Sequence, residues 1–168
     1  DLTQQLLAYA GKARLSVQSV NLSTVAAEMA KLLGTRLSRG ARMVFSFAPR
    51  SVDTMADPVQ IRQIVMNLLT NASDALKGGE GVITIRTGVA KFDRLYLSET
   101  FAPTDIPEGE YAFLEIADDG CGMDQQEMQR IFDPFFTTKF VGRGLGLSVA
   151  LSIVQRHRGA IKVFSERD

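Results

Sequence analysis

The stretch Asp118-Asp119-Gly120-Cys121-Gly122-Met123 decides how this chain is interpreted, because it joins a predicted strand to two closely spaced glycines. The residues before it, 111–117, form an apolar alternating run and predict a strand that delivers Asp118 at its end. Glycine lacks Cβ and tolerates positive φ, so such a pair suits a backbone that approaches a flat ligand closely. An Asp-Gly pair alone is more often an ordinary turn, so the rest of the chain has to decide.

The composition indicates one ordinary globular domain, with 168 residues, 45% of them hydrophobic and 23% charged. Nineteen Lys and Arg balance nineteen Asp and Glu, so no global basic field indicates nucleic acid and we expect no such partner. The single cysteine, Cys121, excludes an internal disulfide framework and a cysteine-based metal cluster. No apolar run approaches the roughly 20 residues needed to cross a bilayer. We expect a cytoplasmic domain of a parent protein that is cytoplasmic or anchored in the inner membrane.

The first twenty residues predict a helix followed by a linker. Leu2, Leu6, Leu7 and Ala10 recur at roughly helical spacing. Residue 1 offers no clear cap before this pattern, which favours the end of a longer helix, although a simple N-terminal helix is equally compatible. Residues 16–20 are expected to be the linker.

Further along, capping residues and breakers divide the chain into alternating elements. Asn21 or Ser23 can cap a helix that ends at Gly40, and Asp57-Pro58 starts a long helix that runs to about Lys77. Strands are expected at 43–47, 82–87, near 89–97, at 110–117 and at 160–164. Residues 98–109 are expected to be a loop, and two more helices are expected near 124–131 and 145–157.

The helix that begins after Asp57 carries two stripes, one apolar and one polar. The polar stripe falls within about 80° of arc at 100° per residue. It consists of Gln60, Gln63, Asn67, Asn71 and Asp74. Asn and Asp lower helix propensity in mid-helix, so their presence indicates that the side chains serve a function.

A glycine-rich segment precedes the last predicted helix. Thr137, Thr138 and Lys139 form a candidate anion-facing group, and glycines occupy every second position from 142 to 146. Glycines that run into a helix N-terminus suit phosphate, because free N–H groups and the positive end of the helix dipole face the anion. The segment is not a Walker A motif, since no G-K-[ST] follows.

Four motifs in this order resemble the N, G1, F and G2 boxes of the catalytic ATP-binding domain of sensor histidine kinases, hybrid forms included, in the GHKL (Bergerat-fold) ATPase superfamily. They are Asn67-x-x-x-Asn71, Asp118-x-Gly120-x-Gly122, Phe132-x-x-Phe135-Phe136 and Gly142-x-Gly144-x-Gly146. The resemblance covers about residues 21–168. It implies an α+β fold, a two-layer α/β sandwich with helices on one face of a mixed sheet and a mobile lid over the nucleotide. Residues 1–20 then correspond to the end of the dimerisation helix and the linker, and 21–168 to a catalytic domain that lacks a final strand.

The resemblance also implies roles for individual residues. Asp118 matches the carboxylate that accepts from the adenine amine, and Asn71 matches the Mg²⁺ ligand. Asn67, Asn71 and Lys139 match catalytic positions. The expected contacts to ATP come from Asn71, Asp74, Lys77, Asp118, Gly120, Gly122, Met123, Thr138, Lys139, Arg143, Gly144, Leu145 and Gly146. The lid is shorter than in many members, because Gly144 leads directly into Leu145.

The function implied is transfer of the ATP γ-phosphoryl to a histidine outside this fragment. The expected partners are the dimerisation and histidine phosphotransfer domain of the same protein and a response-regulator receiver domain, with a homodimer at full length. One alternative is an ATP-hydrolysing switch, but relatives of that kind carry a glutamate one turn before the Mg²⁺ asparagine, where this chain has Asn67. A degenerate nucleotide sensor is the other alternative. The only histidine, His157, matches a family position distinct from the phosphoacceptor, and we expect it to be structural or on the surface.

Overall fold

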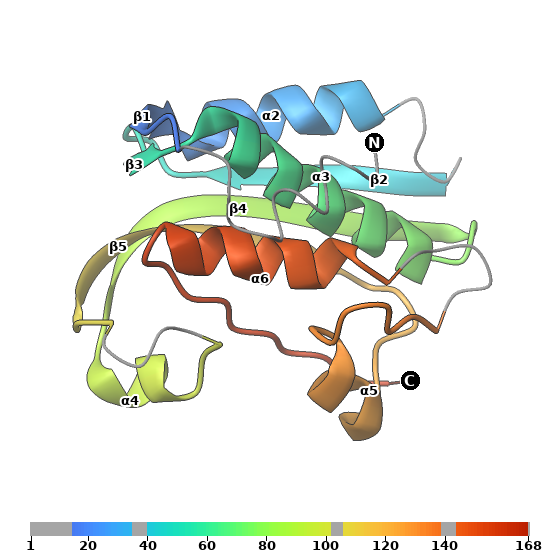
Figure 1. Cartoon of the computed structure of the whole chain (residues 1–168). Helices are drawn as coiled ribbons and strands as arrows, with labels where there is room; N and C mark the ends of the chain where they lie inside the picture. Colours follow the sequence, from blue (N-terminus) through green and yellow to red (C-terminus); the bar gives the residue numbers. More distant parts are fainter. Residues whose placement is uncertain (1–14, 35–39, 102–105, 139–143, 168) are drawn as a thin grey trace.

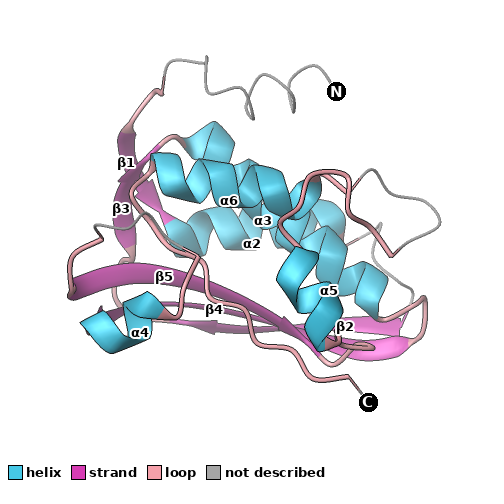
Figure 2. Ribbon diagram, turned by 60° about the horizontal axis from the view of Figure 1, so that its bottom comes forward, coloured by secondary structure: helices cyan, strands magenta, loops and turns pink. Residues whose placement is uncertain are grey.

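The computed structural model describes residues 15–34, 40–101, 106–138 and 144–167, which form two layers (Figure 1). Three helices, α2 (Leu22–Leu33), α3 (Pro58–Ala75) and α6 (Gly146–Arg156), cover one face of a mixed sheet (Figure 2). The predicted two-layer α/β sandwich is therefore confirmed.

The main sheet has the order β2-β4-β5 and is mixed, as predicted. Its strands are β2 (Gly40–Phe47), β4 (Glu80–Phe92) and β5 (Gly109–Asp118). β2 runs parallel to β4, and β4 runs antiparallel to β5 with Ile83 opposite Asp118. Ile83 and Ile85 are fully buried on the face that the helices cover.

The two long helices on the sheet begin at the caps that the sequence predicts. The Asn21 side chain accepts from Thr24 N and starts α2, and the Asp57 side chain accepts from Val59 N and Gln60 N and starts α3. Both helices bury an apolar stripe against the sheet, and the fully buried Val65 and Leu69 of α3 lie at the centre of the core. Burying a side chain of this size contributes about 1.5–3 kcal/mol.

Two short helices also begin at side-chain caps, and α6 packs on α3. α4 (Arg94–Ser98) begins at Asp93, whose side chain accepts from Tyr96 N. α5 (Gln125–Arg130) begins with a reciprocal capping box between Asp124 and Glu127. α6 packs on α3 with the buried residues Val149, Ala150 and Ile153.

Several predicted boundaries are wrong. The helix that begins after Asn21 ends at Leu33 with Gly34 at its C-cap, not at Gly40, which is the first residue of β2. β4 continues to Phe92, and α4 takes the place of the strand expected near 89–97. Alternation does not distinguish one bent strand from two, and the Asp93 cap decides where the chain turns.

Two predictions fail at the edges of the fold. Residues 18–20, expected in the linker, form β1 (Gln18–Asn21) together with the capping residue Asn21. β1 pairs antiparallel with β3 (Asp53–Ala56), a strand that we did not predict. Residues 160–164 form only an isolated bridge, between Ile161 and Phe101, instead of a strand. Four-residue and edge pairings depend on partners distant in sequence, so local patterns miss them.

The predicted domain division between residues 20 and 21 stays a prediction, and the expected dimerisation helix falls largely in residues 1–14, outside the described part of the chain. In the described residues, none of the helices combines the length and apolar character that a bilayer crossing requires.

Candidate functional site

The polar face of α3 carries three of the predicted site residues. Asn67, Asn71 and Asp74 follow each other at spacings of four and three residues, which places them on one side of the helix. Asn67 and Asn71 are half-buried, and Asp74 is exposed. The Asn67 Nδ2 donates to the carbonyl oxygen of Gly146 at 3.0 Å, so this face of α3 contacts the first residue of α6.

At the end of β5, two neighbouring aspartates have different local contacts. The Oδ1 of Asp118 accepts from Gly120 N at 3.1 Å, which orients the carboxylate at the strand end. The Oδ1 of Asp119 accepts from Val82 N at 2.7 Å and ties the following loop to β4. Asp118 is exposed at the strand end, and its role in binding adenine stays a prediction.

The loop from 119 to 123 packs closely against the end of α3. Cys121 N donates to Ala75 O at 3.1 Å, and a Cβ at Gly120 would lie 2.6 Å from the backbone of Ala75. Gly122 has φ +61°, and a Cβ there would lie 1.7 Å from Glu166 O. The protein's own packing therefore requires glycine at both positions. Their expected approach to the base stays a prediction.

The start of α6 has a different character. Leu145 occupies the N-cap position and is buried, and among the described residues no side chain caps this helix end by a hydrogen bond. Gly144 has φ +61°, and its carbonyl accepts from Phe135 N at 2.9 Å. The first-turn N–H groups and the helix dipole suit an anion.

The structure thus brings the loop after β5 and the start of α6 to the C-terminal half of α3, which carries the predicted asparagine motif. The Cys121–Ala75 bond attaches the loop after β5, and the Asn67–Gly146 bond attaches α6. Lys77 follows α3 directly, is exposed and has φ +51°.

Met123 and Thr138 occupy the margins of this arrangement. Met123 is half-buried, and its backbone N donates to Ser165 Oγ at 2.9 Å. Thr138 is exposed at the end of a described segment. Lys139 and Arg143 lie outside the described residues, as does most of the expected lid, so their contacts to phosphate stay predictions.

Sequence reasoning missed three residues that shape this region: Ala75, Asp119 and Ser165. A second aspartate beside Asp118 was a visible signal, but its bond to Val82 spans 37 residues. The contacts of Ala75 and Ser165 carry no local signal, because each depends on the loop after β5 folding back on a distant segment.

The opposite end of α3 is joined to the end of α6 through Asp57, which is buried. Its backbone N donates to His157 Nε2 at 3.0 Å, and its Oδ2 accepts from Ser16 N at 3.0 Å. Burial alone raises the pKa of the Asp57 carboxyl, but the N–H groups of Ser16, Gln60 and Val59, together with His157, outweigh it and hold this pKa below its ordinary value.

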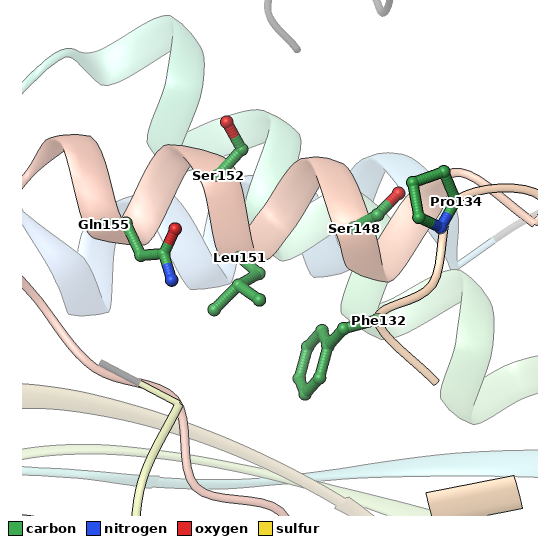
Figure 3. Close-up of a pocket in the computed structure, with 6 residues that line it drawn as sticks. All are labelled: Phe132, Pro134, Ser148, Leu151, Ser152 and Gln155. Atoms are coloured by element: carbon green, nitrogen blue, oxygen red, sulfur yellow. The ribbon is translucent and has the colours of Figure 1, made fainter. Parts of the chain in front are cut away.

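A separate open pocket of about 450 Å³ lies between α6 and the segment after α5. Figure 3 shows its six lining residues, Phe132, Pro134, Ser148, Leu151, Ser152 and Gln155. None of the residues predicted to bind ATP belongs to this lining, although Phe132 is part of the predicted F box.

Comparison with known proteins decides the family. The sequence profile of the histidine kinase-, DNA gyrase B- and HSP90-like ATPases matches residues 56–168. The chain belongs to this family. Sensor kinase CckA of Brucella abortus is 34% identical over 168 residues, covering 98% of this chain and 17% of that protein. Sensor histidine kinase ZraS of Klebsiella oxytoca is 34% identical over 161 residues, covering 95% of this chain and 31% of that protein. The chain thus spans less than a third of the length of these two relatives.

Solved structures agree on the fold. The nucleotide-free catalytic domain of histidine kinase ThkA has a TM-score of 0.64 and 24% identity, covering 84% of this chain and 82% of that chain. ThkA in complex with response regulator TrrA has a TM-score of 0.66 and 23% identity, covering 94% and 40% of the respective chains. The chain is therefore an ATPase domain of this family that is similar, over nearly its whole length, to parts of two sensor kinases.

The donor groups of this site fit a magnesium nucleotide. Among the described residues, no group of three or more His, Cys, Asp or Glu side chains could hold a metal ion. Mg²⁺ in kinase sites is typically held by one or two protein oxygens together with substrate phosphates and water. The amide oxygen of Asn71, one helical turn after Asn67 on the same face of α3, is a donor of this kind.

Proposed function

We propose that this chain binds Mg-ATP and transfers the γ-phosphoryl group to a histidine on another domain of a sensor kinase. The observation that carries the proposal is the contact between the asparagine face of α3 and the first residue of α6. Asn71 follows Asn67 by one turn on the same face and offers a hard oxygen donor, and the first turn of α6 suits phosphate; both features support the proposal. The carboxylate of Asp118 at the end of β5 completes the site on the base side.

Each part of the nucleotide has a proposed partner. Asp118 accepts from the exocyclic amine of adenine, with the loop from Gly120 to Met123 beside the base. Asn71 supplies the protein oxygen to Mg²⁺, which neutralises phosphate charge. The contacts to phosphates and ribose are assigned to Asp74, Lys77, Thr138, Lys139, Arg143, Gly144, Leu145 and Gly146.

In the proposed reaction, an imidazole nitrogen of the acceptor histidine attacks the γ-phosphorus, the bond from that phosphorus to the bridging oxygen breaks, and ADP leaves. Such transfer depends on positioning and on stabilising charge more than on a protein base. The amide of Asn67 cannot take a proton from water. This chemistry supports phosphoryl transfer over the ATP-hydrolysing alternative.

His157 is unsuited to be the acceptor. It follows α6, eleven positions from Gly146, which at about 1.5 Å per residue places it roughly 16 Å from the phosphate-binding end. Its Nε2 also accepts from Asp57 N and its Nδ1 lies 2.8 Å from Ile153 O. Reacting atoms need to approach within about 3–3.5 Å.

The proposed partners are a dimerisation and histidine phosphotransfer domain and a response-regulator receiver domain, with the full-length kinase a homodimer. Support comes from ThkA, a histidine kinase of the same fold that was solved in complex with a response regulator. We place the domain in the cytoplasm, whether or not the parent protein is anchored in the inner membrane.

The test uses γ-labelled ATP with this chain alone and with a separately supplied helical domain that carries an acceptor histidine. We expect acid-labile label on the supplied domain only, and loss of that label with Asn71→Ala. His157→Gln is the matched control and should not lower transfer. Label on the isolated chain that disappears with His157→Gln would overturn the assignment, and release of inorganic phosphate without labelled protein would favour the hydrolytic switch.

A further inference from the structure

Helices α3 and α6 run antiparallel and are hydrogen-bonded to each other at both ends of a shared span. At one end Asn67 Nδ2 donates to Gly146 O at 3.0 Å, and at the other Asp57 N donates to His157 Nε2 at 3.0 Å. The spans measure about 15 Å on α3 and 16.5 Å on α6, from ten and eleven residues at 1.5 Å each. The two bonds therefore hold the helices in one axial register.

The bond at the nucleotide end has one chemically possible direction. A backbone carbonyl only accepts, so the Asn67 side chain must present its NH₂ group to Gly146, and its orientation is fixed by that partner. Gly146 is the first residue of α6. A hydrogen bond to the Gly146 carbonyl therefore also fixes the position of the N–H groups in the first turn of α6.

We propose that Asn67 is a positioning residue, which acts by donating to Gly146 and so sets the phosphate-binding turn of α6 relative to Asn71. It neither ligates the metal nor takes a proton. This inference rests on the proposed function, because it requires that the phosphates bind at the first turn of α6. The position of Asn67, one turn before Asn71, does not by itself indicate this positioning role.

The geometry makes the role specific for asparagine. An aspartate has the same shape, but its carboxylate cannot donate to a carbonyl and repels it. The same aspartate would be a better Mg²⁺ ligand than an amide, since Mg²⁺ prefers carboxylates. Asn67→Asp therefore separates the two roles: positioning predicts a loss of affinity for Mg-ADP, whereas metal ligation predicts that affinity is retained or increased.

The experiment measures ADP and adenosine affinity by calorimetry, with and without Mg²⁺, for the unmutated chain, Asn67→Ala, Asn67→Asp and His157→Gln. We expect Asn67→Ala to weaken ADP binding about fivefold to tenfold in both conditions, the effect of one lost hydrogen bond, and to leave adenosine binding unchanged. Asn67→Asp should lose at least as much for Mg-ADP. His157→Gln loosens the same helix pair at its far end, so it should lower the melting temperature and keep ADP affinity within twofold.

Three results would overturn the proposal: a loss with Asn67→Ala that occurs only with Mg²⁺, an equal loss for ADP and adenosine, or full Mg-ADP affinity in Asn67→Asp. NMR of the nucleotide-free chain tests the bond without any ligand. We expect a through-bond coupling from the Asn67 side-chain nitrogen to the Gly146 carbonyl carbon, and its absence would also refute the proposal. An unmutated chain that shows this coupling but binds no ADP would instead refute the proposed function.

Discussion

Gly120 and Gly146 both belong to predicted nucleotide contacts, but they lack a side chain for different reasons. A Cβ on Gly120 would lie 2.6 Å from the backbone of Ala75, which α3 and the core hold in place. A Cβ on Gly146 would meet nothing nearer than Asn67 Cγ at 3.7 Å, an ordinary van der Waals contact. The fold itself excludes a side chain at Gly120 and leaves room for one at Gly146.

The difference indicates how the two sides of the site are built. On the side proposed to bind the base, glycine lets the loop after β5 pack onto α3, and we propose that the side chain of Asp118 at the strand end recognises adenine. On the side proposed to bind phosphate, a Cβ on Gly146 would contact the Asn67 side chain at an ordinary distance, so packing among the described residues does not require glycine there. Glycines that look alike in the sequence therefore separate into one that packing requires and one that packing does not require, for which we propose a role in binding. Four substitutions, at Gly120, Asp118, Asp57 and Gly146, test these packing and binding roles.

The largest effect is expected from Gly120→Ala. The new methyl group would force the loop away from Ala75 and lower the free energy of unfolding by on the order of 3 kcal/mol, the upper range for overpacking. Chemical denaturation measures this loss. Gly34→Ala is the control, because its Cβ would lie 3.4 Å from Ala30 O and should cost far less. Equal stability of the two variants would refute the packing role of Gly120.

Asp118→Asn should weaken ATP binding by about 1.5–3 kcal/mol, the range for a charge-assisted hydrogen bond, and leave stability nearly unchanged. Asp119→Ala is the matched variant, because it removes the bond to Val82 N and should lower stability by about 1 kcal/mol instead. Calorimetry and thermal unfolding measure the two effects. Equal affinity of the unmutated chain for ATP and GTP would refute adenine recognition by Asp118.

Asp57→Asn tests the N-cap of α3, the end of this helix that lies away from the loop after β5 and from the start of α6. The pKa of Asp57 lies below its ordinary value of 3.8, so its charge contributes stability that is present above pH 3.8 and is lost as pH falls toward the folded-state pKa. Asparagine still caps the helix but carries no charge. The variant should be on the order of 1 kcal/mol less stable at pH 7, and this difference should shrink in acid. A stability difference that stays constant from pH 7 to pH 3 would contradict the assignment.

The smallest effect on stability, and of opposite sign, is expected from Gly146→Ala. Replacing glycine by alanine where alanine can adopt the same backbone conformation stabilises a protein by about 0.4–1 kcal/mol. The new Cβ would come no nearer than 3.7 Å to Asn67 Cγ, so the chain without nucleotide should be equally or more stable. ADP affinity should fall, because the methyl group adds bulk beside Asn67 at the helix end to which we assign the phosphates. If the nucleotide-free variant were less stable, Gly146 would be required by packing like Gly120. If its ADP affinity were unchanged, Gly146 would have no role in binding.

Local patterns in the sequence determined the long elements and the chemical groups. Asn21 and Asp57 are caps whose side chains satisfy N–H groups two or three residues away, and the polar stripe with Asn67 and Asn71 follows from helical spacing alone. The order of the motifs also indicated the family, because each motif is a short run of neighbouring residues. Boundaries such as Gly40 were wrong, since a glycine can end a helix or begin a strand with the same intrinsic freedom.

Only the tertiary structure decided what the motifs contact. β1 and β3 pair across more than thirty residues, His157 reaches Asp57 across 100, and Asn67 reaches Gly146 across 79. The packing of Gly120 on Ala75 likewise depends on where β5 ends relative to α3. Such contacts form because burial of the shared core brings the elements together, and that burial is a property of the whole chain, which no window of neighbouring residues contains.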